Sequence, residues 1–415
     1  MEYQISIILD KRYANISGQY PAKIMVYSVL QKKNKRYATG KDYTLKEFES
    51  IWETTKPRKE YQNEREYLKL LENKATEIAK SIIPFNFEQF ERKFFRKSGD
   101  GCNVFYYYTK TIDELKKNKQ IGTSSTYSLS EKSIRAFLEY KKGHVSEQLS
   151  FYDITPKFLH AYENYMLIEK KNSRTTISMY LRVLRTLFNI ALKHKEIDPE
   201  FYPFGKGKYE IPATQNIKKS LNKEQLQILY RAKPQTPEQQ KAKDFFFFSY
   251  SCNGMNIKDI ALMKYEHIQG DKLIFYRAKT INTAKTHLKP VKAYLTEFAK
   301  SVIGKYGNPN KEKKNYIFSI IDPTNTETQR HTKIKNFTKF INQHIKKLAV
   351  ANGLPESIST YFARHSFATM AIQSGASMEF VSEALAHSNM KTTQNYFAGF
   401  DENSQKEFIE KIMNF

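Results

Sequence analysis

Hydrophobic and polar residues alternate over the first fifty positions of the chain, in the period-two pattern of β-strands. One run contains Tyr3, Ile5 and Ile7, and a second contains Ile24 and Val26. Turn-forming glycine and proline residues separate the two runs. The pattern predicts a small N-terminal β-sheet.

A helical connector is expected to follow this sheet. Thr44 is followed three residues later by Glu47, which is the spacing of an N-terminal capping box. Residues 60–80 are rich in charge and have helical character. Residues 1–80 are therefore predicted to form an N-terminal module with its connector.

The periodicity changes to 3.6 residues between positions 85 and 202, which predicts a helical bundle. Its last helix carries an apolar stripe that includes Ile177, Leu181, Leu184, Phe188 and Ala191. Four basic residues lie off this stripe, namely Arg174, Arg182, Arg185 and Lys193. They form either a face that binds a polyanion or an ordinary solvated face.

A linker is predicted at residues 203–221, which mix proline, glycine and lysine without periodicity. Asn222 and Gln225 have the spacing of a capping box and open a last domain at 222–415. This domain is predicted to be mainly helical, with a β-hairpin whose strands at 273–276 and 288–291 flank a polar turn. The fold class is thus multi-domain, with a small N-terminal β-sheet, an all-α bundle and a mainly α domain with a small hairpin.

The charge of the chain indicates a polyanionic partner. The 415 residues contain 68 Lys and Arg against 43 Asp and Glu, a net charge of +25, and residues 271–350 alone hold 17 basic against 5 acidic residues. No apolar run is long enough to span a membrane, and the N-terminus lacks a signal-peptide pattern. We therefore expect a cytoplasmic protein associated with the nucleoid. Two cysteines and the lack of a phosphate-binding glycine loop predict neither a metal nor another cofactor.

Candidate chemistry is concentrated near the C-terminus, where three segments occur in order. They read Thr-Tyr-Phe-Ala-Arg-His-Ser-Phe-Ala-Thr at 360–369, Leu-Ala-His-Ser at 385–388 and Thr-Thr-Gln-Asn-Tyr-Phe at 392–397. Attack on a phosphodiester requires a nucleophile and positive donors for the phosphate oxygens. Tyr396 can supply the nucleophile, and Arg364 can clamp the phosphate. With a lysine, Arg364 and His387 can provide the positive surround that a phenol of pKa ~10 needs near neutral pH.

These segments resemble the C-terminal signature of the tyrosine recombinases, the phage-integrase family. In that family an Arg, a His about two dozen residues later and a Tyr nine residues beyond it recur together, and here they are Arg364, His387 and Tyr396. The resemblance implies a site-specific recombinase that cleaves and rejoins DNA through a 3′-phosphotyrosine, without metal or nucleotide. It also implies an arm-type DNA-binding domain at 1–80, a SAM-like core-binding domain at 85–202 and a catalytic domain at 222–415. The chain is most similar to integrases of conjugative or mobilisable elements.

Three positions depart from the family pattern. Asn256 follows Gly254 by two residues, where the family has its first catalytic arginine, and Lys258 and Arg277 are the candidate substitutes. Tyr361 stands where the family usually has a histidine, and its hydroxyl can donate to phosphate but cannot carry protons near pH 7. Ala386 replaces the usual glycine before His387.

The hairpin sequence Arg277-Ala-Lys279-Thr resembles the part of the family that carries the catalytic lysine. Lys279 is the first candidate for the acid that protonates the departing 5′-oxygen, and Lys285 is the second. The catalytic set expected from the sequence is Tyr396, Arg364, His387, Lys279, Tyr361 and Asn256.

Two alternative functions remain open from the sequence. Asn256 and Tyr361 allow a catalytically impaired, DNA-binding or architectural relative, and the shared chemistry allows an enzyme similar to type IB topoisomerases. For a recombinase, the family implies double-stranded DNA as partner, with core-type and arm-type sites, and a tetramer on that DNA. A host DNA-bending protein is a further candidate partner. The apolar stripe of Phe408, Ile412 and Phe415 either packs on its own domain or docks on a neighbouring subunit.

Overall fold

The structure is a computed structural model that describes residues 2–95, 100–144, 146–213, 219–279, 281, 289–387, 389–394 and 402–413. The chain groups into two compact units. One contains residues 1–114 and 125–213, and the other contains residues 115–124 and 214–415.

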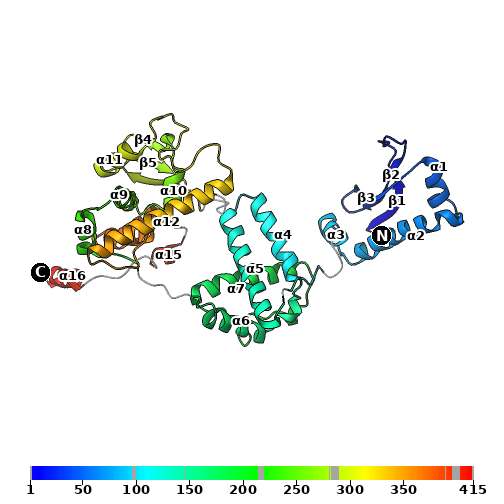
Figure 1. Cartoon of the computed structure of the whole chain (residues 1–415), viewed down its shortest axis with the longest axis horizontal. Helices are drawn as coiled ribbons and strands as arrows, with labels where there is room; N and C mark the ends of the chain where they lie inside the picture. Colours follow the sequence, from blue (N-terminus) through cyan, green and yellow to red (C-terminus); the bar gives the residue numbers. More distant parts are fainter. Residues whose placement is uncertain are drawn as a thin grey trace. The chain divides into compact units, whose positions relative to one another are not determined.

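A three-stranded antiparallel sheet in the order β1-β2-β3 forms the N-terminal part. Ile5 pairs with Val26 and Ile7 with Ile24, and the alternation that predicted the strands places Ile7, Ile24 and Val26 in the core. Thr44 and Glu47 form the predicted capping box. The long helix α2 lies beside β1 (Figure 1). The elements are β1 (Tyr3–Leu9), β2 (Tyr20–Ser28), β3 (Lys33–Tyr43), α1 (Leu45–Phe48), the π-helix η1 (Glu49–Glu53), the 3-10 helix η2 (Lys59–Tyr61), α2 (Gln62–Lys80) and α3 (Phe87–Phe94).

The next part is the predicted helical bundle. Its last helix, α7, buries Ile177, Leu181, Leu184, Phe188 and Ala191, and the four basic residues off that stripe are exposed. The apolar stripe thus forms the bundle core and leaves a basic outer face. The elements are α4 (Val104–Lys117), α5 (Ile121–Lys142), η3 (Phe151–Asp153), α6 (Pro156–Ile168), α7 (Arg174–Lys193) and η4 (Pro199–Phe201).

The C-terminal part is built around α9, whose Phe245, Phe246 and Phe248 are fully buried. Helices α12 and α13 pack against α9, and Figure 1 shows α12 as the long helix that crosses this part. The elements are α8 (Lys223–Arg231), α9 (Pro237–Ser251), α10 (Ile257–Leu262), η5 (Tyr265–His267), β4 (Ile268–Gln269), β5 (Lys272–Phe275), β6 (Val291–Tyr294), α11 (Glu297–Tyr306), α12 (Glu327–Ala351), α13 (Thr360–Gln373), α14 (Met378–Ala384), α15 (Met390–Gln394) and α16 (Glu402–Met413).

The predicted hairpin is confirmed, but its second strand lies further along the chain than expected. Strands β4, β5 and β6 form an antiparallel sheet in that order, with Phe275 opposite Val291. Val291 and Ala293 point into the core and alternate with exposed residues, so β6 begins at Val291 rather than ending there. The capping box of Asn222 and Gln225 at the start of α8 is confirmed.

The fold class predicted from the sequence is confirmed: a small N-terminal sheet, an all-α bundle and a mainly helical C-terminal part with a small sheet. Among the described residues, no helix combines the length and the apolar character that crossing a membrane requires.

Candidate active site

Arg364 lies on α13 with only 3% of its surface exposed. Its Nη1 donates to the carbonyl of Gly254, at 3.0 Å, and its Nη2 donates to the carbonyl of Leu385, at 2.6 Å. These carbonyls belong to the turn between α9 and α10 and to the end of α14. One guanidinium therefore joins three motif segments that are far apart in the sequence.

The close approach of Arg364 explains why residue 254 is a glycine. Gly254 has a φ of +62°, which side chains of L-residues rarely adopt. A Cβ at this position would lie 2.7 Å from the Cα of Arg364 and 3.0 Å from its Cγ. Glycine thus allows the turn to pass directly over the base of the arginine side chain.

His387 lies beside Arg364 and between two hydrogen-bonding groups. Its Nε2 is 3.2 Å from Nη2 of Arg364, and its Nδ1 is 3.0 Å from the hydroxyl of Thr393 on α15. Burial, followed by the charges of Arg364, Arg277 and Lys279, lowers the pKa of His387 from 6.5 to about 3. The ring is therefore neutral at pH 7, and the positive charge expected of it comes from the arginines and Lys279 instead.

Arg277 follows β5 and shares an acceptor with Arg364. Its Nη1 donates to the carbonyl of Leu385, at 3.4 Å, and its Nε lies 4.0 Å from a carboxylate oxygen of Asp259. The other oxygen of Asp259 accepts from the backbone N–H of Ala278, at 2.9 Å. Asp259 therefore fixes the start of the loop that carries Arg277 next to Arg364. Burial raises the pKa of the Asp259 carboxyl.

The other predicted residues differ in where they lie. Asn256 is the N-cap residue of α10 and is partly exposed. Within the described residues, its side chain accepts no hydrogen bond from the backbone of that helix. Lys258 is exposed on α10. Lys279 is exposed two residues after Arg277 and acts electrostatically on His387. Tyr361 is 45% exposed on α13, with its ring 5.1 Å from that of His365.

The structure therefore brings Arg364, His387 and Arg277 together. Tyr396 and Lys285 lie outside the described residues.

Thr393 is absent from the catalytic set expected from the sequence, although it lies inside the third motif segment. It is fully buried and contacts His387 from the helix that precedes Tyr396. The one sequence signal was its position six residues after His387. Asp259 fitted the family pattern, but its link to Arg277 depends on tertiary structure.

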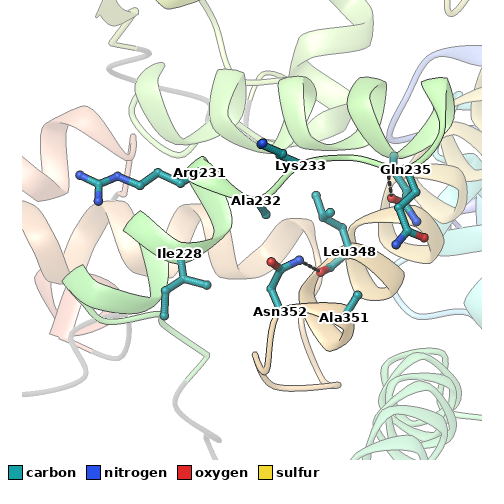
Figure 2. A pocket seen from close by; sticks show the side chains of 9 residues that line it. Ile228, Arg231, Ala232, Lys233, Gln235, Leu348, Ala351 and Asn352 are labelled. Atoms are coloured by element: carbon teal, nitrogen blue, oxygen red, sulfur yellow. Dashed lines mark hydrogen bonds between the residues drawn. The ribbon is translucent and has the colours of Figure 1, made fainter.

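Among the described residues, three motif residues line a small cavity. The space lined by Asp259, Arg277 and Arg364 has a volume of about 10 Å³, which is too small for a phosphate group. A larger pocket of about 510 Å³ lies elsewhere, between α8, the start of α9 and the C-terminal end of α12, and holds none of the motif residues (Figure 2). The described residues include no group of His, Cys, Asp and Glu able to hold a metal ion.

Two sequence models of known protein families match the chain. The sequence model of the phage integrase SAM-like domain matches residues 103–211, and that of the phage integrase family matches residues 219–403, which include every motif described above. The chain belongs to the phage integrase family of tyrosine recombinases. It is a tyrosine-type site-specific recombinase, an enzyme that binds DNA and cleaves and rejoins its strands. A catalytically impaired relative is not favoured.

Individual recombinases of this family are distant relatives of the chain. Tyrosine recombinase XerC of Leptospira interrogans serogroup Icterohaemorrhagiae serovar copenhageni (strain Fiocruz L1-130) is 25% identical over 322 residues, which cover 76% of this chain and 93% of XerC. Tyrosine recombinase XerA of Thermococcus onnurineus (strain NA1) is 24% identical over 225 residues, covering 54% of this chain and 71% of XerA. The solved structure of the Tn1549 transposon integrase with a circular intermediate DNA has a TM-score of 0.51 and 16% identity, covering 75% of this chain and 99% of that chain.

Proposed function

We propose that this recombinase uses Tyr396 as nucleophile and Arg364, Arg277, Lys279 and His387 around the scissile phosphate. The Tyr396 oxygen attacks phosphorus, the bond to the 5′-oxygen breaks, and the DNA 3′-end becomes a phosphotyrosyl ester. Lys279 gives a proton to the departing 5′-oxygen. A 5′-hydroxyl from another strand reverses these steps and restores the phosphodiester. The observation that carries the proposal is the convergence of Arg364 and Arg277 on the Leu385 carbonyl beside His387.

Arg277 is our candidate for the cation that replaces the arginine missing at Asn256. Lys258, the other candidate, is exposed, whereas Arg277 is among the charges that lower the pKa of His387. Arg277 shares the Leu385 acceptor with Arg364, and it can present a second guanidinium to the phosphate oxygens. Tyr361 is assigned at most a hydrogen bond from its exposed hydroxyl to the DNA backbone.

The test of this assignment compares Arg277→Ala with Lys258→Ala in single-turnover cleavage. Removal of one preorganised donor lowers cleavage on the order of 100-fold or more, so Arg277→Ala is expected to do so while Lys258→Ala changes cleavage little. Adding Asn256→Arg to Arg277→Ala should restore part of the loss. Equal rates for the unaltered protein and Arg277→Ala would contradict the assignment.

We further propose that the three parts of the chain contact different parts of the DNA. The exposed Arg182 and Arg185 of α7 place positive charge on the core-binding bundle, which we assign to residues 85–202, with a linker at 203–221. Residues 1–80 are assigned to an arm-type site, because a small three-stranded sheet precedes the core-binding bundle there. Residues 222–415 carry the catalytic site and the C-terminal tail.

The biological setting is part of the same proposal. The enzyme is expected to integrate or excise a mobile element in the cytoplasm, at the nucleoid, as a tetramer on DNA, with a host DNA-bending protein as possible partner. Exposed Ile409, Ile412 and Met413 on α16 support self-association, because docking on a neighbouring subunit would remove them from water.

A nicked suicide substrate tests the proposed chemistry. The duplex is selected for binding from a random-sequence pool and nicked near the cleavage site, so that the cut strand diffuses away and the enzyme stays attached. We expect a covalent adduct with the unaltered protein and none with Tyr396→Phe. An adduct that persists in Tyr396→Phe would refute the nucleophile. Sustained relaxation of supercoiled plasmid without strand exchange would favour the topoisomerase alternative.

A further inference from the structure

We propose that Lys219, near the end of the linker, contacts a DNA phosphate next to the scissile one and so positions the strand for cleavage. The inference rests on the proposed function, in which Arg364 holds the scissile phosphate. Lys219 is exposed, and it is absent from the catalytic set expected from the sequence. No step of the proposed cleavage uses its charge.

The linker ends on α13, the helix that carries Arg364. The backbone N–H of Leu221 donates to the hydroxyl oxygen of Ser366, at 2.8 Å. Both residues are fully buried, and Leu221 belongs to the hydrophobic core of the C-terminal part. Such a hydrogen bond is costly to break, because the buried N–H would then have no partner. The linker is therefore anchored two residues along the same helix from Arg364.

This anchor determines where Lys219 lies. Its Nζ is 6.0 Å from the centre of the Tyr361 ring, near the start of α13. Two residues of chain span at most roughly 7 Å, and the five-residue step from Tyr361 to Ser366 rises about 7.5 Å along a helix. The two lengths agree, so the end of the linker runs alongside the start of α13. The backbone of Lys219 therefore stays near Tyr361 as long as Leu221 is buried.

Tyr361 lies at the exposed edge of the proposed site. It precedes Arg364 by three residues, so the two side chains are neighbours on the surface of α13. Its ring is 5.1 Å from that of His365, which is among the charges that lower the pKa of His387. Tyr361 is 45% exposed, whereas Arg364 is 3% exposed. We expect a DNA strand that presents a phosphate to Arg364 to pass close to Tyr361 and Lys219.

Lys219 and Tyr361 offer the kind of donors that a phosphate accepts. The lysine ammonium has three N–H donors on a flexible stem, and the tyrosine hydroxyl can donate one hydrogen bond. Contacts of this kind fix the register of a strand without reading its sequence. A contact one phosphate away from the scissile bond thus aligns that bond with the residues that act on it, which favours cleavage.

Hydrogen exchange of the Leu221 amide in the full-length protein tests the anchor. We expect this amide to exchange as slowly as the amides in the middle of α13, because its acceptor is buried. Exchange at the rate of an unstructured peptide would show that the linker is not fixed on α13, and it would overturn the proposal.

Substitution of Lys219 tests its role in cleavage. At saturating suicide substrate, we expect Lys219→Ala to lower the single-turnover rate about tenfold or more, the worth of one hydrogen bond to a charged group. Lys219→Arg should keep most of the rate, because it retains the charge. Lys223→Ala is the matched control, since Lys223 is exposed four residues later at the start of α8. Equal rates for Lys219→Ala and Lys223→Ala would overturn the proposal.

Neutral methylphosphonates in the DNA identify the phosphate that Lys219 contacts. The phosphates on either side of the scissile one are replaced one at a time. At the contacted position, the unaltered protein should slow about tenfold, whereas Lys219→Ala should lose little more than it has already lost. If every replacement slows both proteins by the same factor, Lys219 contacts none of these phosphates and the proposal is wrong.

Arg364→Ala in the same assay separates this inference from the proposed function. It should remove most of the cleavage. If the unaltered protein forms no adduct, or if Arg364→Ala cleaves at the unaltered rate, the proposed function fails and this inference fails with it. If Arg364→Ala does not cleave while Lys219→Ala behaves as Lys223→Ala does, only the role of Lys219 is wrong.

Discussion

Gly254→Ala should damage the active site far more than the same substitution at Gly270. The two glycines have nearly equal φ angles, +62° and +60°, so alanine pays a similar backbone cost of roughly 1–2 kcal/mol at both. Gly270 lies in the turn between β4 and β5 and has nothing within 4 Å of an added Cβ. Gly254 would place its Cβ 2.7 Å from the Cα of Arg364.

The difference between the two variants isolates the contact with Arg364. An ordinary contact begins at 3.4 Å, so the turn and α13 must separate by at least 0.7 Å. Overpacking of this kind costs roughly 1–3 kcal/mol, in addition to the backbone cost. Displacing a positioning group by about 1 Å can lower the rate on the order of 100-fold.

The assay combines chemical denaturation with single-turnover cleavage of the suicide substrate. We expect Gly270→Ala to lower the free energy of unfolding by the backbone cost alone. It should cleave at the rate of the unaltered protein. Gly254→Ala should lose about twice as much stability and cleave on the order of 100-fold more slowly at temperatures where it remains folded. Equal stability and equal rates in the two variants would refute the reasoning about this contact.

Three further predictions concern charge and strain. Ala386 has a φ of +51°, so Ala386→Gly should relieve roughly 1–2 kcal/mol of backbone strain in the folded protein. About half of that gain is lost because glycine makes the unfolded chain more flexible. The midpoint of denaturation should therefore rise, and a lower midpoint would contradict this. Between pH 6.5 and about 3, the folded protein binds fewer protons at His387 than the unfolded chain does, so the free energy of unfolding should fall as pH falls through this window. The fall should be less steep in His387→Gln. Equal slopes of stability against pH in the two proteins would contradict the lowered pKa. Affinity for duplex DNA should drop steeply with salt, because a chain with a net charge of +25 releases counterions on binding, whereas a flat dependence would contradict distributed phosphate contacts.

Features that depend on local sequence could be predicted well. The capping boxes at Thr44 and Asn222 involve side chains three residues apart, so their spacing alone identifies the helix starts. The apolar stripe of α7 likewise depends on a repeat within one helix. The second hairpin strand was placed too early, because the apolar residues near 288–291 do not reveal which of them pairs with Phe275.

Features of the site that depend on distant segments could not be predicted. Lys258 and Arg277 were equal candidates from the sequence, and the choice rests on a hydrogen bond to Leu385, 108 residues away from Arg277. His387 was expected to add positive charge, but burial among cations makes its ring neutral. Thr393 had no visible role, because its hydroxyl matters only where the chain folds back on His387.

The most direct test of the account identifies the residue that carries the DNA. The covalent adduct is digested with nuclease and trypsin, and the modified peptide is sequenced by mass spectrometry. Trypsin cleaves after Lys391 and Lys406, and Tyr396 is the single tyrosine of the peptide 392–406. We predict a nucleotide attached through its 3′-phosphate to Tyr396 in that peptide. A nucleotide on another residue, such as Tyr361, or one attached through a 5′-phosphate, would contradict the proposed mechanism.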